Sequence, residues 1–285
     1  KNQKHGFGFS IFGLQNREIA YMTDTNKLQF LRSDDNFMQR RLDAAVWYTY
    51  RPEYAVTHSL RLAFHHYWIS DTIVKLNPEY LGQGRTQEDV LQLTYRLEYN
   101  GVDNWNYPLV GQRFIGVFDQ KLAMLSGKWQ SSLHLHYDRY FNPFPKWYGS
   151  IVARVRGSIP QQQPYIFRQN LGYEYDYIRG YEYYVIDGSS FGMLRANIKR
   201  ELLNIRVKLP IKFFEVIPIR VYGKVYGDVG AGYNKYPVND NYHNRALYST
   251  GFGIDIVTLY DIKLRVEYTI NHLNEKGLYL HRNGE

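Results

Sequence analysis

The sequence of 285 residues contains no cysteine, and none of its apolar runs is long. A chain without cysteine cannot depend on disulfide bonds for its stability. No segment approaches the ~18 consecutive apolar residues that cross a membrane as a helix. The chain starts at Lys1 almost directly on a strand pattern and shows no signal peptide, so we expect a mature or trimmed product. These absences exclude a disulfide-stabilised fold and a helical membrane protein.

Aromatic residues, in contrast, are abundant. They make up 17% of the chain, and 28 of them are tyrosines. Tyrosine suits a membrane–water interface, because its ring is apolar while its hydroxyl prefers water. The mean hydropathy is nevertheless negative. This combination is typical of a membrane β-barrel, in which every second residue of a strand faces a wet lumen.

Apolar and polar residues alternate with a period of two through most of the chain, which is typical of β-strands. In the clearest segment, Leu93, Tyr95 and Leu97 share one face, whereas Arg96 and Glu98 share the other. Similar patterns predict twelve strands, at residues 6–14, 42–51, 60–65, 91–99, 112–120, 133–138, 151–156, 194–201, 219–229, 252–256, 262–271 and 277–282.

The connections between these segments differ in length. Long ones at about 16–40, 71–89, 160–189 and 234–246 alternate with short ones near 52–58, 100–110, 142–147 and 259–261. Exceptions are the short connections at 121–128 and 272–276 and a medium one at 203–218. Outer-membrane barrels have short periplasmic turns and longer outer loops, and lipid leaves no strand edge unpaired.

We therefore predict an all-β fold, a closed antiparallel transmembrane barrel of about twelve strands that forms one domain over residues 1–285. Leu93, Tyr95 and Leu97 are expected to face lipid, and Arg96 and Glu98 the lumen. An even strand number places both termini on the periplasmic side of a bacterial outer membrane.

The net charge of +8 is dispersed, because basic residues are interleaved with acids along the strands. We attribute the excess to a basic lumen and basic loops. The alternative is attraction to anionic lipid headgroups or acidic partners. No basic helix or aromatic RNA-binding motif is present, so we expect no nucleic-acid partner.

His134, His136 and Asp138 have a spacing at which a strand presents all three side chains on one face. A metal ion bridging two of them is one interpretation. We favour the other, a polar lumen face, since lumen positions must carry polar side chains. We therefore predict no metal and no cofactor.

The long connection at 160–189 contains the segment Tyr177-Ile178-Arg179-Gly180-Tyr181-Glu182-Tyr183. The strand after it ends in Glu201, and the next strand carries Asp228-Val229-Gly230. This trio resembles the BamA–TamA superfamily of outer-membrane barrels, which insert or translocate proteins across the bacterial outer membrane. The turn Asp103–Gly111 also resembles a periplasmic turn of that family.

The resemblance implies a protein that acts without covalent chemistry and is not an enzyme. It implies a loop folded into the lumen, where Arg179 meets Glu201 and Asp228. Gly180 permits a tight loop tip, and the tyrosines Tyr177, Tyr181 and Tyr183 are expected to pack against the inner wall. The alternative is that Arg179 is an ordinary solvated loop charge.

The sequence departs from the family pattern in lacking four N-terminal strands, the periplasmic domains and a terminal aromatic residue. The chain could therefore be the C-terminal part of a sixteen-stranded barrel. Gly6 and Gly8 in the first strand, with Gly277 and Tyr279 in the last, would form a weak seam for a client strand. Expected partners are outer-membrane lipid, client outer-membrane or secreted proteins, and a second copy or another barrel. The alternative function is a passive pore or structural scaffold.

Overall fold

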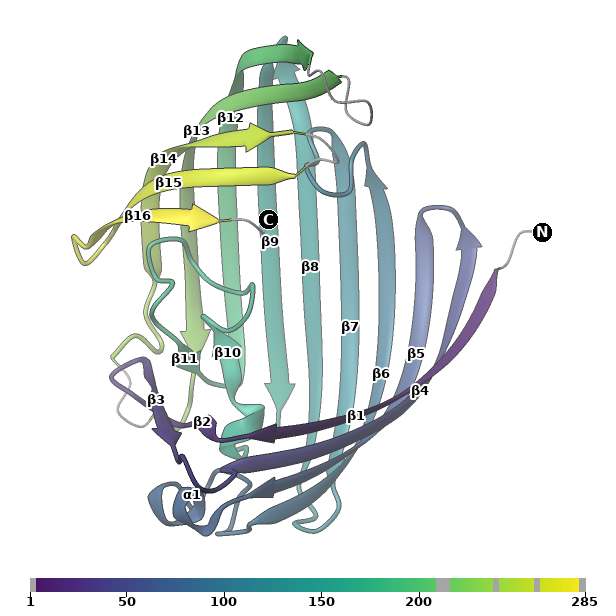
Figure 1. The fold of residues 1–285 in the computed structure, drawn as a ribbon, viewed down its shortest axis with the longest axis vertical. Helices are drawn as coiled ribbons and strands as arrows, with labels where there is room; N and C mark the ends of the chain where they lie inside the picture. The colour runs from purple at the N-terminus through teal and green to yellow at the C-terminus, as the bar shows by residue number, and fades with distance from the viewer. Residues whose placement is uncertain (1–3, 209–215, 238–240, 259–261, 282–285) are drawn as a thin grey trace.

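Twelve strands form one antiparallel sheet in the computed structural model, which describes residues 4–208, 216–237, 241–258 and 262–281 (Figure 1). The predicted number of strands is confirmed. The predicted turn at 259–261 lies outside the described residues. In order of pairing, the strands are β1 (His5–Asn16), β4 (Gln39–Glu53), β5 (Val56–Ile69), β6 (Gln87–Val102), β7 (Gly111–Ala123), β8 (Trp129–Phe144), β9 (Trp147–Ile159), β12 (Ser190–Lys208), β13 (Val216–Tyr233), β14 (Leu247–Val257), β15 (Lys263–Asn271) and β16 (Lys276–His281).

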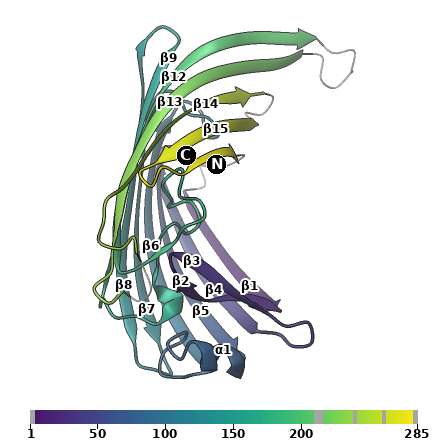
Figure 2. The same ribbon diagram turned by 90° about the vertical axis from the view of Figure 1, so that its left-hand side faces the viewer.

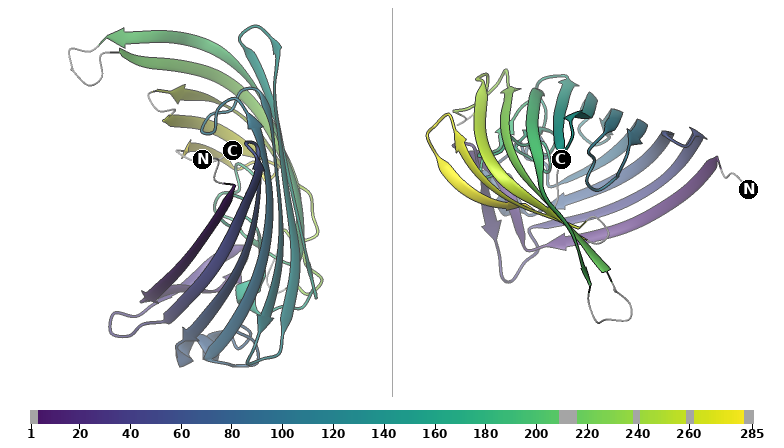
Figure 3. Two further views of the ribbon diagram at one scale, coloured as in Figure 1. Left: turned by 90° about the vertical axis from the view of Figure 1, so that its right-hand side faces the viewer. Right: turned by 90° about the horizontal axis from the view of Figure 1, so that it is seen from above.

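The sheet is strongly curved, so that it has a convex and a concave face (Figures 2 and 3). The period-two alternation decides which side chains lie on each face, because directly opposed residues of paired strands share a face. Leu93 and Tyr95 are exposed on the convex face. Arg96 lies on the concave face, where it donates a hydrogen bond to Glu98, 3.0 Å away. The predicted division of these residues between two faces is confirmed.

The two edges of the sheet are β1 and β16. Within the described residues the pairing runs from β1 to β16 without a pair that joins these two strands. Closing a sheet requires the tilt and stagger of its strands to bring both edges together. At the curvature seen here the two edges stay apart, so the predicted closure is not among the observed pairings (Figure 3).

The connections divide between the two ends of the sheet. One end, the short-turn end, carries the tight connections 54–55 and 145–146 and the turn 103–110. The other, the long-loop end, carries the connections 17–38, 70–86 and 160–189. Both β1 and β16 have their free ends at the short-turn end, because they run antiparallel to their neighbours. The predicted alternation of long and short connections is thus present.

The long-loop end contains the remaining secondary structure. A hairpin of β2 (Glu18–Asp24) and β3 (Lys27–Arg32) lies in the connection 17–38. The short helix α1 (Asp71–Leu76) lies in the predicted loop 71–89 and was not predicted; its Ile73 is buried against Ile69 and Leu81. None of the helices among the described residues has the length and apolar character needed to cross a bilayer.

The connection 160–189 turns back along the concave face (Figure 1). It contains the 3-10 turn η1 (Tyr165–Phe167) and the short strands β10 (Gln169–Leu171) and β11 (Ile186–Asp187), which pair with each other. An apolar cluster fixes it to the sheet, and its buried members are Leu171, Ile178, Tyr181, Ile186, Phe191, Met193 and Leu247. We call residues 172–185 the inserted loop.

Candidate functional site

The tip of the inserted loop is a tight turn that brings Arg179 to the concave wall. The backbone N–H of Tyr181 donates to the carbonyl oxygen of Ile178 at 3.0 Å. Gly180 has φ +84°, in the left-handed region that favours glycine. A Cβ added there would lie 2.8 Å from Cγ2 of Thr269 on β15. Glycine therefore allows both the turn and the close approach of the loop to the sheet.

Arg179 holds Asp228 of β13 through a bidentate ion pair. Nε lies 2.8 Å from Oδ2, Nη2 lies 2.5 Å from Oδ1, and the backbone N–H of Arg179 adds a bond of 3.1 Å to Oδ2. Both side chains are almost completely buried. The planar guanidinium matches the two carboxylate oxygens, which makes such pairs strong and directional.

The rest of the guanidinium is also occupied. Nη1 donates to Oδ1 of Asn197 at 2.7 Å and lies 3.4 Å from Oε1 of Glu267. Its plane covers the ring of Tyr226, with Cζ 3.8 Å from the ring centroid. Cations are attracted to the face of an aromatic ring at this distance. Four side chains on β12, β13 and β15 therefore hold one loop side chain.

A larger charge network surrounds this contact. Lys224 Nζ lies 2.6 Å from both Oδ1 of Asp255 and Oε1 of Glu267. Lys199 Nζ is 3.5 Å from Oδ2 of Asp255, and Arg195 Nε is 3.8 Å from Oδ2 of Asp228. All of these side chains are buried, where a charge is tolerated only with partners. The wall beneath the inserted loop is thus one connected electrostatic unit.

A second connection reaches the same network from the opposite end of the sheet. Tyr107, in the turn 103–110 at the short-turn end, is buried and donates its hydroxyl to Oδ2 of Asp255 at 2.8 Å. Lys199 Nζ lies 4.6 Å from the centre of its ring. Asp103 shapes the turn by accepting the backbone N–H groups of Leu109 and Val110 at 2.9 and 3.1 Å. The network therefore contacts loops from both ends.

Glu201, expected beside Arg179, lies elsewhere. Arg195 is directly opposite Asp228, whereas Glu201 is opposite Tyr222. Glu201 lies six positions beyond Arg195 along β12, which is about 20 Å at ~3.3 Å per residue. Glu201 accepts instead from Nδ2 of Asn204 at 3.4 Å. The structure brings Arg179 to Asp228 but not to Glu201, and Glu267 of β15 supplies the second carboxylate.

The three tyrosines of the inserted loop differ in their surroundings. Tyr181 is buried and hydrogen-bonds through its hydroxyl with Nδ1 of His272. Burial raises the pKa of Tyr181 above its ordinary value. The ring of Tyr177 lies 4.5 Å from Cζ of Arg195. Tyr183 is 77% exposed, so the expectation that all three pack on the wall is wrong for Tyr183.

His134, His136 and Asp138 on β8 each contact other polar side chains. Asp138 accepts from Nε and Nη2 of Arg113 at 2.8 and 2.5 Å, and its other oxygen lies 2.6 Å from Nε2 of His136. His134 Nε2 is 3.7 Å from Asp176 in the inserted loop. Within the described ranges no group of three or more His, Cys, Asp or Glu side chains is arranged to hold a metal ion.

The glycines expected at a seam lie on the two edge strands. On β1, a Cβ at Gly8 would lie 2.2 Å from the Trp47 ring, whereas Gly6 meets only Cβ of Thr49 at 3.8 Å. On β16, a Cβ at Gly277 would lie 2.5 Å from the ring of Tyr279. Gly8 and Gly277 thus make room for aromatic rings beside each edge.

Sequence reasoning missed Asn197, Tyr226, Glu267, Lys224, Asp255 and Tyr107 as members of this site. The alternation shows which residues of each strand point to the concave face. It shows the same for many residues that are not part of this site. Tyr107 belongs to a turn that the sequence marked by Asp103 and Gly111, without a sign that its side chain reaches the sheet.

Comparison with solved structures identifies a similar fold. The crystal structure of BamA from Haemophilus ducreyi lacking POTRA domains 1-3 matches with a TM-score of 0.59 and 13% sequence identity. The match covers 96% of this chain and 57% of that one. No family model and no curated protein matches the sequence. The chain therefore has a BamA-like β-barrel fold and spans little more than half the length of the BamA structure that it matches.

Proposed function

We propose that the protein is a bacterial outer-membrane barrel that assists the insertion or translocation of other proteins and performs no covalent chemistry. The observation that carries this proposal is the inserted loop, which is held on the concave wall through Arg179 and Asp228 in a sheet with a BamA-like fold. The division of the sheet into an apolar convex face and a charged concave face supports a lipid environment outside and a polar lumen inside.

We further propose that the sheet is closed when it is in the membrane. Unpaired backbone N–H and C=O groups cost several kcal/mol each in hydrocarbon, so neither β1 nor β16 is stable there as a bare edge. Closure between these strands gives a barrel of twelve strands; the alternative is that this sheet is the C-terminal part of a sixteen-stranded barrel. The short-turn end and both termini then lie in the periplasm.

In this mechanism the inserted loop stabilises the wall of β12 to β15, while the edge strands form a weaker seam. An edge strand offers its backbone groups to an incoming strand. Gly6 and Gly8 on β1, and Gly277 and Tyr279 on β16, lie at that seam. The proposed partners are lipid, client proteins with unpaired strands, and a second copy or another barrel.

The test is reconstitution of the purified protein into liposomes, followed by measurement of the rate at which an unfolded outer-membrane barrel folds into them. We expect faster folding than in protein-free liposomes, and a slower rate with Arg179→Ala. If the rate equals that of empty liposomes while planar bilayers conduct freely, the protein is a passive pore and the proposal is overturned.

A further inference from the structure

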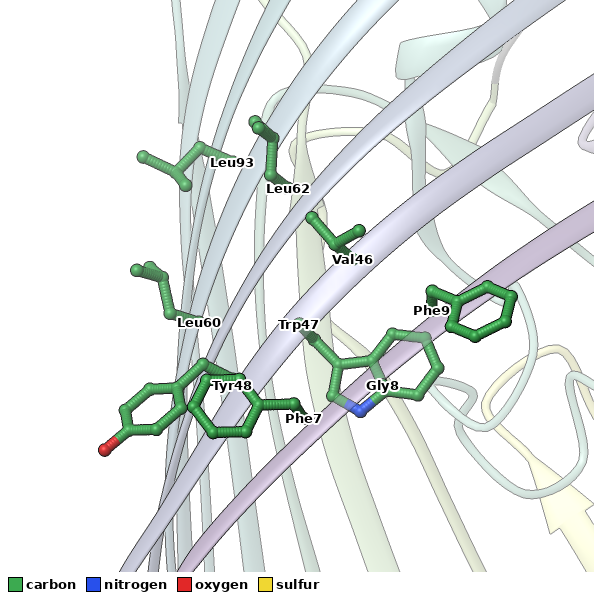
Figure 4. A pocket seen from close by; sticks show the side chains of 9 residues that line it. All are labelled: Phe7, Gly8, Phe9, Val46, Trp47, Tyr48, Leu60, Leu62 and Leu93. Atoms are coloured by element: carbon green, nitrogen blue, oxygen red, sulfur yellow. The ribbon is translucent and has the colours of Figure 1, made fainter.

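A groove of about 620 Å³ lies on the convex face of β1, β4, β5 and β6 (Figure 4). Phe7 and Phe9 of β1 line one side, and Leu60, Leu62 and Leu93 line the other (Figure 4). This volume falls within the ~300–1,000 Å³ that is usual for ligand sites. The groove is almost entirely apolar, so it suits a hydrocarbon chain.

The groove belongs to an ordered series of rows across the four strands. The first row is Phe9, Val46, Leu62 and Leu93, which are opposed in register. The short side chain of Val46 between larger neighbours creates the depression. The second row, toward the short-turn end, is Phe7, Tyr48, Leu60 and Tyr95, and the third is His5, Tyr50, His58 and Leu97.

Polar groups thus gather at one end of the groove. His5 Nδ1 lies 2.6 Å from the hydroxyl of Tyr48, and His58 Nδ1 lies 2.8 Å from the hydroxyl of Tyr95. Tyr50 lies between the two imidazoles, with ring centroids 5.1 Å from His5 and 6.1 Å from His58. Since each ring uses Nδ1 for a tyrosine, Nε2 remains available for a ligand on the exposed side.

The two basic residues at the same strand ends do not belong to this surface. Lys4 precedes His5 and Arg51 follows Tyr50, so the alternation places both on the concave face, where Nε of Arg51 donates to Oγ1 of Thr57 at 3.4 Å. On the convex face of β13 to β15 the side chains do not change from apolar to polar toward the short-turn end. Val221, Ile256 and Leu264 form an aliphatic row near that end.

We infer that this surface binds one glycerophospholipid, with an acyl chain in the groove and its phosphate at His5 and His58. The inference rests on the proposed membrane location, and it deepens that proposal by naming a specific lipid partner beside the edge strand β1. From Val46 to Tyr50 the strand rises about 13 Å at ~3.3 Å per residue, enough to separate an acyl chain from a headgroup.

The test is native mass spectrometry of the full chain, refolded in an uncharged detergent, with three probes of equal acyl composition. These are phosphatidylglycerol, phosphatidylethanolamine and diacylglycerol. We expect one molecule of either phospholipid per chain, bound about tenfold more tightly than diacylglycerol. His5→Ala with His58→Ala should remove that advantage, and Val46→Trp should weaken all three by filling the groove.

Two matched controls lie outside the site. Val225 on β13 is 56% exposed, as is Val46, so Val225→Trp tests an equal change on the convex face elsewhere. His66 lies on the same face of β5 near the long-loop end, where it pairs with Asp89 at 2.7 Å. Val225→Trp and His66→Ala should leave phospholipid binding unchanged.

Equal binding of diacylglycerol, or an unchanged affinity in Val46→Trp or in the histidine pair, would overturn the site. Equal losses in Val225→Trp would indicate a general lipid coat and would also overturn it. If the alanine pair does not fold, His5→Gln with His58→Gln replaces it. Failure of the wild type to insert into liposomes refutes the proposed function; insertion without phospholipid retention refutes only this inference.

Discussion

Arg179 and Asp228 are 49 residues apart in the chain, yet Nε and Nη2 of the arginine lie 2.8 and 2.5 Å from the two carboxylate oxygens. This pair joins the inserted loop to β13 in a nearly water-free setting. Breaking a buried pair by removing one partner typically costs about 3–5 kcal/mol, because the remaining charge is uncompensated.

Arg179→Ala should therefore lower the thermal unfolding midpoint of the protein in detergent and release the inserted loop. Arg179→Lys keeps the charge but loses the planar fork, so its midpoint should lie between those of wild type and Arg179→Ala. The heat-dependent band shift in gels measures the midpoint, and limited proteolysis reports release of the loop. A wild-type midpoint for Arg179→Ala would show that the pair contributes nothing to stability.

The same pair should show strong coupling. In a double-mutant cycle with Arg179→Ala and Asp228→Asn, the second change should cost much less once the first is present, with a coupling energy within about 0.5–3 kcal/mol. Equilibrium unfolding by urea in detergent provides the free energies of unfolding. Additive losses would mean that the two side chains act independently.

Glu267 and Glu201 provide a matched comparison, because both glutamates occupy strand positions that face the concave side of the sheet. Glu267→Gln should destabilise the protein, because Glu267 contacts both Arg179 and Lys224. Glu201→Gln should change the free energy of unfolding by no more than about 0.5 kcal/mol, as is usual away from buried networks. Equilibrium unfolding by urea measures the loss of unfolding free energy in each variant. An equal loss in both would contradict the placement of Glu267, rather than Glu201, beside Arg179.

Tyr107 should affect the network from the opposite end. Tyr107→Phe removes only the hydroxyl bonded to Asp255 and should cost about 1–3 kcal/mol, because it leaves a buried acceptor short of a partner. Hydrogen exchange of the inserted loop should also increase if the network joins the two ends. Tyr54, which is 98% exposed in another connection at the same end, is the control for Tyr→Phe.

Closure can be tested because the chain has no cysteine of its own. Phe9→Cys with Leu280→Cys places one thiol on each edge strand, on the convex face. A disulfide forms readily only when the Cα atoms lie within about 4.4–6.8 Å. In liposomes we expect oxidation to link residues 9 and 280 if β1 and β16 pair directly; pairs shifted by two residues along β16 control for register. If no disulfide bond forms in any of these cysteine pairs, the sixteen-stranded alternative is favoured.

Docking of the inserted loop should depend on pH through Glu182. Burial raises the pKa of Glu182 above its ordinary value, and His281 and Glu267 lie nearby. The stabilisation of the docked loop is therefore complete below the ordinary pKa of a glutamate and is lost as the pH rises through the raised value. Proteolysis of the loop should slow on acidification, and Glu182→Gln should flatten that part of the profile. An unchanged profile in Glu182→Gln would assign the dependence to another group.

The sequence by itself determined the strands, their faces and the distribution of loops. Leu93 and Arg96 lie on opposite faces because successive side chains of a strand point to alternate faces, which the local backbone alone determines. The glycine after Arg179 likewise marks a tight turn through local conformational freedom. These features need no knowledge of distant residues.

Only the tertiary structure decided which acids meet Arg179. Glu201 and Glu267 both have inward parity, but Glu201 is displaced along β12, whereas strand order carries Glu267, 88 residues from Arg179, to its side. The irregularity in register between Glu201 and Leu203 is also invisible in the alternation. Long-range placement depends on the registers of several successive strand pairs, and period-two alternation constrains each register only to steps of two residues.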